Sequence, residues 1–169
     1  MHEQAFFVQP AVRQLGSEKR KENARLSCLI FELNETELSQ GTQVKGNPED
    51  LKQSLSNILN NAAESMQGCG KVTLGVIQAN HFVTVVVTDE GPGFTRVALE
   101  QFRRGVPVAS SKTDGSGLGL RGSQECLRRL GGTLEISEVN GRASATIQIP
   151  ILASPPSPTF LLPRPHRSS

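Results

Sequence analysis

The feature that most constrains the fold is a helix-forming segment that carries side-chain amides beside an apolar stripe. Asn57 and Asn61 stand one helical turn apart on the face next to that stripe. Asparagine is a mediocre helix former, so three asparagines within residues 57–61 indicate that amides are wanted on this face. Amide oxygens suit Mg²⁺, a cation that bridges substrate phosphates, although a polar helix face without a ligand is the alternative. The stripe itself has helical spacing and predicts a buried face made of Leu51, Leu55, Ile58, Leu59 and Ala62.

Two glycine-rich boxes follow this helix. In the first, the β-branched run 85–88 ends in Asp89, and Gly91 and Gly93 come directly after it. Such a run predicts a strand that delivers an acid, after which the glycines turn the chain. On its own, this box is also compatible with a simple surface turn.

The second box, residues 115–120, reads Gly-Ser-Gly-Leu-Gly-Leu and opens a helical pattern that continues through Leu127 and Leu130. Glycines at a helix start expose backbone N–H groups and the positive end of the helix dipole, which favours phosphate. The spacing is neither that of a Walker loop nor that of a dinucleotide fingerprint.

In this order, the asparagine helix, Asp-x-Gly-x-Gly and Gly-x-Gly-Leu-Gly-Leu resemble the ATP-binding family shared by sensor histidine kinases, DNA gyrase, the Hsp90 chaperones and MutL. The Gly-Leu-Gly-Leu ending, the turn at 130–134 and the strand closing at Ile149-Pro150 look most like the catalytic domain of a two-component sensor histidine kinase. The resemblance covers residues 6–150. It implies ATP and Mg²⁺ as cofactors.

The order of the expected elements predicts an α/β fold. It is a two-layer sandwich of the Bergerat type, with a mixed, mostly antiparallel sheet that carries helices on one face. Residues 1–152 are expected to form this domain, and the Pro/Ser-rich residues 153–169 a disordered tail. The expected strands are 5–10, 26–33, 42–46, 71–78, 82–88, 133–138 and 143–149, and the expected helices are 11–24, 48–68, 97–102 and 118–130.

The resemblance also implies the contacts of the nucleotide. Asp89 would accept a hydrogen bond from the adenine amino group, and Gly91 and Gly93 would let the backbone approach the purine. Asn61 matches the family's Mg²⁺ ligand, and Asn57 would face the phosphates. The remaining implied contacts are Lys112, Gly115, Ser116, Gly117, Leu118, Gly119, Leu120 and Ser144.

Asn57 and Lys112 are the two residues expected to act in catalysis. Asn57 stands where the gyrase-like branches carry a glutamate, and since an amide cannot deprotonate water, transfer to another acceptor is favoured over hydrolysis. Lys112 lies in residues 103–116, an expected lid over the nucleotide, and could reach the γ-phosphate. A solvated loop lysine is the alternative. Arg103 and Arg104 are candidates for phosphate or partner contacts, and Phe102 is expected to pack beneath the lid.

The composition excludes several other classes of function. The chain has 169 residues, a formal net charge of +2 and scattered basic residues, so one domain without a nucleic-acid surface is expected. It contains no apolar run long enough to span a membrane, and no membrane contact is expected. Cys28, Cys69 and Cys126 lie in no metal-ligand spacing, which favours a reducing compartment and thus the cytoplasm.

A sensor kinase also needs a phosphoacceptor histidine on a dimerising helix, and His2, His81 and His166 have no such setting. The favoured hypothesis is a histidine kinase catalytic domain that is inactive without a phosphoacceptor domain. It would transfer the γ-phosphoryl group of ATP to a histidine on a separate dimerisation domain or partner, with a response regulator downstream. An ATP-responsive protein-binding module and a serine kinase resembling anti-sigma factors are the alternatives.

Overall fold

The fold is built on one five-stranded sheet with the strand order β2-β4-β5-β7-β6. In the computed structural model, which describes residues 4–22, 29–36, 41–106 and 118–153, β2 and β4 are parallel. All other neighbours in this sheet are antiparallel, so the predicted mixed, mostly antiparallel sheet is confirmed. The strands are β2 (Leu29–Thr36), β4 (Gly70–Ala79), β5 (Phe82–Asp89), β6 (Thr133–Val139) and β7 (Arg142–Pro150).

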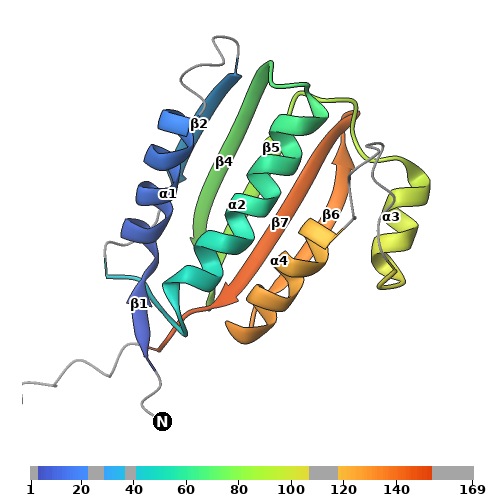
Figure 1. The fold of residues 1–169 in the computed structure, drawn as a ribbon. Helices are drawn as coiled ribbons and strands as arrows, with labels where there is room; N and C mark the ends of the chain where they lie inside the picture. The colour runs from blue at the N-terminus through green and yellow to red at the C-terminus, as the bar shows by residue number, and fades with distance from the viewer. Residues whose placement is uncertain (1–3, 23–28, 37–40, 107–117, 154–169) are drawn as a thin grey trace, which may run out of the picture.

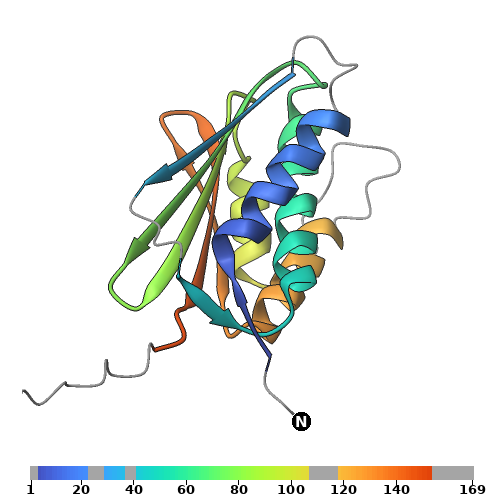
Figure 2. The same cartoon turned by 90° about the vertical axis from the view of Figure 1, so that its left-hand side faces the viewer.

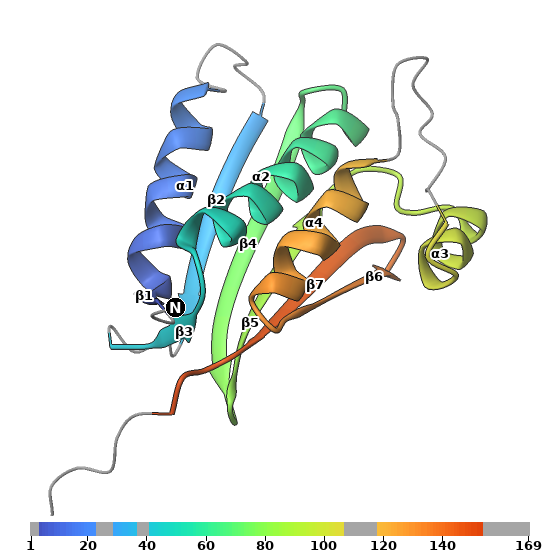
Figure 3. The ribbon, with the colours of Figure 1, turned by 60° about the horizontal axis from the view of Figure 1, so that its bottom comes forward.

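Three helices cover one face of this sheet: α1 (Val8–Glu22), α2 (Pro48–Ser65) and α4 (Leu118–Arg129). Figure 2 shows the two layers edge-on, with the sheet on one side and these helices on the other. A shorter helix, α3 (Arg96–Arg103), lies beyond the β6 edge of the sheet (Figures 1 and 3). The predicted two-layer α/β sandwich is therefore confirmed. Within the described residues, none of the helices has the length and hydropathy needed to cross a membrane.

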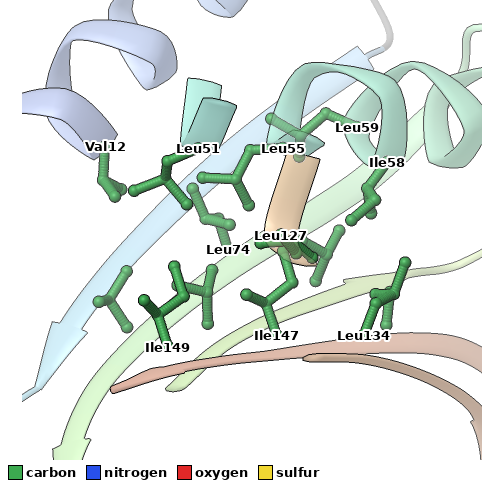
Figure 4. Close-up of a cluster of buried hydrophobic side chains, with 14 of the residues drawn as sticks. Val12, Leu51, Leu55, Ile58, Leu59, Leu74, Leu127, Leu134, Ile147 and Ile149 are labelled. Atoms are coloured by element: carbon green, nitrogen blue, oxygen red, sulfur yellow. The ribbon is translucent and has the colours of Figure 1, made fainter. Parts of the chain in front are cut away.

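The core lies between the sheet and α2. Leucines of the predicted stripe on α2 meet Leu127 of α4 and Ile147 and Ile149 of β7 (Figure 4). Strand residues alternate between the two faces of the sheet, so Val83, Val85 and Val87 point inward together with Asp89. The strand that carries this acid is thereby fixed in register by the core.

The start of α2 follows the predicted capping chemistry. The Asn47 side chain accepts a hydrogen bond from the backbone N–H of Glu49 at 3.0 Å, and Pro48 occupies the first helical position. The helix ends at Ser65, three residues before the expected end, because the chain reverses at Gln67 and Gly68 with φ values of 56° and 75°. Both predicted hairpins are present, with Asn80 (φ 56°) in one turn and Asn140 (φ 53°) in the other.

The N-terminal region differs from the prediction. Residues 5–10 were expected to be one strand, but β1 (Ala5–Phe7) ends before α1, which begins at Val8 and holds Pro10 in its first turn. A proline is tolerated there because that turn has no intrahelical acceptor for its N–H groups. β1 pairs with β3 (Gln43–Lys45) in a separate two-stranded sheet.

The C-terminal end of the described domain is also hydrogen-bonded to β3. The N–H of Leu152 donates to the carbonyl of Gln43 at 2.8 Å, and the N–H of Gly46 donates to the carbonyl of Gln4 at 2.7 Å. Both ends of the described domain therefore meet at β3. The expected tail, apart from Ala153, lies outside the described residues.

Candidate nucleotide site

Asp89 is the acid delivered by β5, and it is only 6% exposed at the end of that strand. Its Oδ1 accepts a hydrogen bond from the backbone N–H of Gly91 at 2.8 Å. Burial raises the pKa of this carboxyl group, and hydrogen bonds from the Gly91 N–H and the Ser65 hydroxyl lower it in part. The site thus holds a desolvated acceptor for a donor group of a ligand.

The two glycines after Asp89 leave no room for a side chain. A Cβ at Gly91 would lie 2.7 Å from Ser65 Oγ and 2.8 Å from Asp89 Oδ1. Gly93 has φ of 81°, and a Cβ there would lie 3.0 Å from the carbonyl oxygen of Gly141. These glycines let the loop pack against the end of α2 and against the β6–β7 turn, whichever ligand is bound.

The amide pair on α2 lies against the first turn of α4. The Asn57 side-chain amide donates to the carbonyl of Gly119 at 3.5 Å, and its Oδ1 accepts from Gln53 at 3.0 Å. A Cβ at Gly119 would approach Asn61 Nδ2 to 3.3 Å. The structure therefore brings Asn57 and Asn61 together with the start of the helix that the second glycine box opens.

Asn60 has a different environment. Its Oδ1 accepts a hydrogen bond from Lys19 Nζ of α1 at 3.0 Å, on the side of α2 that faces away from α4. Lys19 is 5% exposed and also pairs with Glu22 at 2.7 Å. The expectation that all three asparagines serve one face is therefore wrong for Asn60, which links two helices.

The other predicted contacts fall into three groups. Leu118 is the first residue of α4, and the Leu120 side chain belongs to the core at 7% exposure. Ser144 pairs with Thr88, one position from Asp89, so its side chain leaves the sheet on the opposite face from that carboxylate. The third group, Lys112, Gly115, Ser116 and Gly117, lies outside the described residues.

Phe102 is buried in the core beside the start of the expected lid, and residues 107–116 of that lid are likewise outside the described residues. Sequence reasoning missed Ser65, whose Oγ lies with Asp89 Oδ1 beside the space that Gly91 leaves open. Ser65 follows Asn57 and Asn61 at the same four-residue spacing, so extending that stripe by one more turn identifies it.

Comparison with known proteins agrees with this arrangement. The model of the family described as histidine kinase-, DNA gyrase B- and HSP90-like ATPase matches residues 46–153, more than half of the chain. Sporulation kinase C of Bacillus subtilis is 34% identical over 122 residues, which are 72% of this chain and 28% of that kinase. The sensor histidine kinase ZraS of Salmonella typhi is 30% identical over 127 residues, 74% of this chain and 26% of ZraS.

Solved structures show the same fold. The nucleotide-free catalytic domain of the histidine kinase ThkA aligns with a TM-score of 0.70 at 22% identity, covering 89% of this chain and 96% of that domain. The mycobacterial sensor histidine kinase MprB aligns at 0.66 and 24% identity, covering 88% and 97%. The chain spans about a quarter of the length of the two curated kinases above, at 28% and 26%. The chain belongs to the family of histidine kinase-, DNA gyrase B- and HSP90-like ATPases, whose fold binds ATP.

Proposed function

We propose that this chain is the catalytic domain of a sensor histidine kinase, which transfers the γ-phosphoryl group of ATP to a histidine on a separate domain or partner. The observation that carries the proposal is the arrangement of two features along one helix, α2. Its Asn57/Asn61 amide pair lies against the first turn of α4 at Gly119, and its last residue, Ser65, lies beside the loop of the buried Asp89 carboxylate.

These residues fit an adenine nucleotide. The Asp89 carboxylate can accept from the adenine amino group, whereas guanine would present a carbonyl there. The first turn of α4 offers backbone N–H groups and a positive dipole end to phosphates. We assign Lys112 and the glycines of residues 115–119 to the same phosphates on the resemblance stated above.

The Asn61 amide oxygen would hold Mg²⁺ together with the phosphates, and Mg²⁺ would supply positive charge against the transferring group. Asn57 donates to Gly119 and has no basic atom, so it can orient a phosphate but cannot activate water. This favours transfer to an acceptor over hydrolysis. A response regulator would receive the phosphoryl group from the histidine.

The exposed face of α3 is a further candidate for partner contact. It lines a groove of about 330 Å³ with Arg96, Leu99, Glu100, Arg103 and Arg104. Glu100 pairs with Arg104 at 2.7 Å, whereas Arg96 and Arg103 have no ion pair with any described residue. We propose that these two arginines contact acidic side chains of the histidine-bearing partner.

We also propose a domain boundary at residue 152 and a cytoplasmic location. Cys69 and Cys126 are both free thiols, which supports a reducing compartment. An ATP-responsive binding module and a serine kinase are less favoured, because the matched relatives carry the names of sporulation and sensor histidine kinases.

The test supplies radiolabelled ATP and Mg²⁺ to the chain with a separate dimerising domain that bears a histidine helix, followed by a receiver domain. We expect acid-labile phosphate on the supplied histidine and then on the receiver, and we expect Asp89→Asn to reduce this labelling at limiting ATP. The chain incubated alone should hydrolyse ATP slowly and remain unlabelled. Nucleotide binding without transfer to any acceptor would favour the binding module, and acid-stable phosphate on serine would favour the serine kinase.

A further inference from the structure

We propose that Ser123 is a positioning residue of α4, whose buried hydroxyl holds the Gly119 peptide so that the first turn of this helix is oriented toward the nucleotide phosphates. The inference rests on the proposed function, which assigns phosphates to that turn. It adds a residue outside the asparagine pair and the two glycine boxes, because Ser123 follows the second box by three positions and is fully buried.

The Ser123 hydroxyl lies between two backbone carbonyls, one from each helix. Ser123 Oγ is 3.0 Å from the carbonyl oxygen of Gly119, one turn earlier in α4, and 3.1 Å from that of Ser54 in α2. A single hydroxyl proton can be shared between two acceptors in a three-centre hydrogen bond. A helical serine that bonds the carbonyl one turn before it is common, but the second contact here links the Gly119 peptide to the neighbouring helix.

The Gly119 carbonyl has a second donor on α2. The Asn57 amide donates to it at 3.5 Å, a long hydrogen bond, so the shorter contact of Ser123 is the stronger restraint on this peptide. Gly119 also lies close to the proposed metal ligand, because a Cβ there would be 3.3 Å from Asn61 Nδ2. A rotation of the Gly119 peptide therefore changes both the direction of the neighbouring N–H groups and the space beside Asn61.

Burial strengthens this contact and also provides a matched control. Ser54 and Ser123 are both 0% exposed, and a buried hydrogen bond is shielded from competition by water. The Ser54 hydroxyl lies 3.4 Å from the carbonyl oxygen of Ser123, so its side chain contacts α4 one turn beyond Gly119. The two serines thus share size, burial and a contact between the same helices, while the Ser123 hydroxyl contacts the Gly119 carbonyl.

The experiment compares Ser123→Ala with Ser54→Ala, the matched control, and with Ser123→Cys, which nearly keeps the volume but replaces the hydroxyl by a weak donor. Calorimetry measures the affinity of each variant for Mg-ATP and for adenosine, the latter by its displacement of Mg-ATP. Adenosine has the base without phosphates, so the ratio of the two affinities isolates the phosphate contacts. Thermal unfolding identifies a temperature at which all variants are folded.

We expect Ser123→Ala to lower the affinity for Mg-ATP roughly three- to tenfold and to leave the adenosine affinity unchanged, because the phosphates depend on the first turn of α4 and the base does not. Ser123→Cys should lose part of the ATP affinity. Ser54→Ala should keep both affinities, although it too lowers the Tm. An equal loss for ATP and adenosine in Ser123→Ala overturns the proposal, as does an unchanged ATP affinity.

Ser123→Cys also decides the proposal if Ser123→Ala does not fold. Parent-like ATP affinity in Ser123→Cys overturns the proposal, because the volume of the side chain would then suffice without the hydroxyl. If the parent chain binds neither ATP nor adenosine, the proposed function fails and this inference fails with it. If the parent chain binds ATP and Ser123→Ala binds it equally well, the inference alone fails.

Discussion

At the residue scale, two adjacent asparagines of α2 differ in role: Asn60 has a structural contact, and Asn61 has a proposed functional one. Asn60 accepts a hydrogen bond from Lys19 of α1, while Asn61 faces the start of α4 at Gly119. Both are exposed amides of one helix, so replacement by alanine, the better helix former, changes the helical preference equally at the two positions. Their difference lies only in what the amide contacts.

We expect Asn61→Ala to abolish most of the Mg²⁺-dependent part of ATP affinity and leave the fold intact, because its amide is the proposed metal ligand. Calorimetry with Mg²⁺ and with chelator measures this part. Asn60→Ala is the matched control and should reduce only the free energy of unfolding, by about 0.5–1.5 kcal/mol, through loss of the Lys19 hydrogen bond. If Asn61→Ala loses the same ATP affinity with and without Mg²⁺, the Asn61 amide is not a ligand of the metal.

The ionised Asp89 carboxylate should lower the free energy of unfolding of the nucleotide-free chain. Burial raises its folded-state pKa above the unfolded value, so the unfolded state binds fewer protons between the two values and stability falls as pH rises through this window. Above the folded-state pKa the full cost is present, and below the unfolded-state value it is absent.

Asp89→Asn should therefore stabilise the nucleotide-free chain near neutral pH and weaken ATP binding by about 1–3 kcal/mol. The asparagine oxygen can still accept from the Gly91 N–H, while its NH₂ group opposes the adenine amino group. Denaturant titrations at about pH 7 and pH 4 measure the first effect, which should shrink at the lower pH. Glu90→Gln, at the exposed neighbouring acid, is the control. Equal affinities of the parent chain for ATP and GTP would contradict the adenine contact.

At the element scale, α2 and α4 approach closely through small residues. Ser123 is fully buried and its hydroxyl lies 3.1 Å from the carbonyl oxygen of Ser54 and 3.0 Å from that of Gly119. A Cβ at Gly122 would lie 3.5 Å from Asn57 Nδ2, an ordinary contact, whereas one at Gly119 would approach Asn61 Nδ2 to 3.3 Å. The two glycines of one helix thus differ in how much room they have.

Gly122→Ala should stabilise the chain by about 0.5–1 kcal/mol, because alanine is the better helix former and its methyl group fits. Gly119→Ala should gain less and weaken Mg-ATP binding, since the Asn61 amide must shift. Thermal unfolding and calorimetry on both variants measure the contrast. Equal ATP affinities in the two variants would show that α4 does not restrain Asn61.

The elements also show what the sequence could predict. The cap at Asn47, the apolar stripe of α2 and both hairpins depend on local spacing, and all are present. The predicted strand 5–10 was wrong because the length of β1 depends on its pairing with β3, which lies far along the chain. Local patterns carry no information on such a distant partner.

The candidate site shows the same limit. Asp89, Asn57 and Asn61 could be found because each lies in a motif of fixed spacing. The face of Ser144 depends on the register of β7 against β5, and the role of Asn60 depends on the position of α1. Ser65 was missed because Asp89, beside which it lies, is the last residue of β5 and is separated from it along the chain by all of β4.

At the scale of the whole molecule, α3 and its cap combine positive charge with exposed apolar surface. Three arginines, Arg96, Arg103 and Arg104, stand against the single glutamate of this helix, Glu100. Val97 on the same helix is 63% exposed, so apolar surface accompanies the charge. Such a surface fits a protein partner with carboxylates around an aliphatic side chain.

Arg96→Glu combined with Arg103→Glu should therefore lower phosphotransfer to a supplied histidine domain several-fold at low salt, with ATP affinity unchanged. Initial rates of labelling at two salt concentrations measure this effect, which should weaken as salt is added. Arg128→Glu, at an exposed arginine of α4 that pairs with Glu125, is the control. A loss of ATP affinity in the double variant would place these arginines at the nucleotide instead.

Both ends of the described domain are hydrogen-bonded to β3 or the residue after it, at Gln43 and Gly46, and they lie at the same end of the molecule (Figure 3). Closing a short loop between neighbouring ends costs little entropy, because that cost grows slowly with loop length. A circular permutant that joins Leu152 to Gln4 by a few glycines and opens between Asn80 and His81, in the turn of the β4–β5 hairpin, keeps every strand pairing. We expect it to fold and bind ATP, which calorimetry can verify, so the continuity of the chain is dispensable at the end of β5 opposite to Asp89.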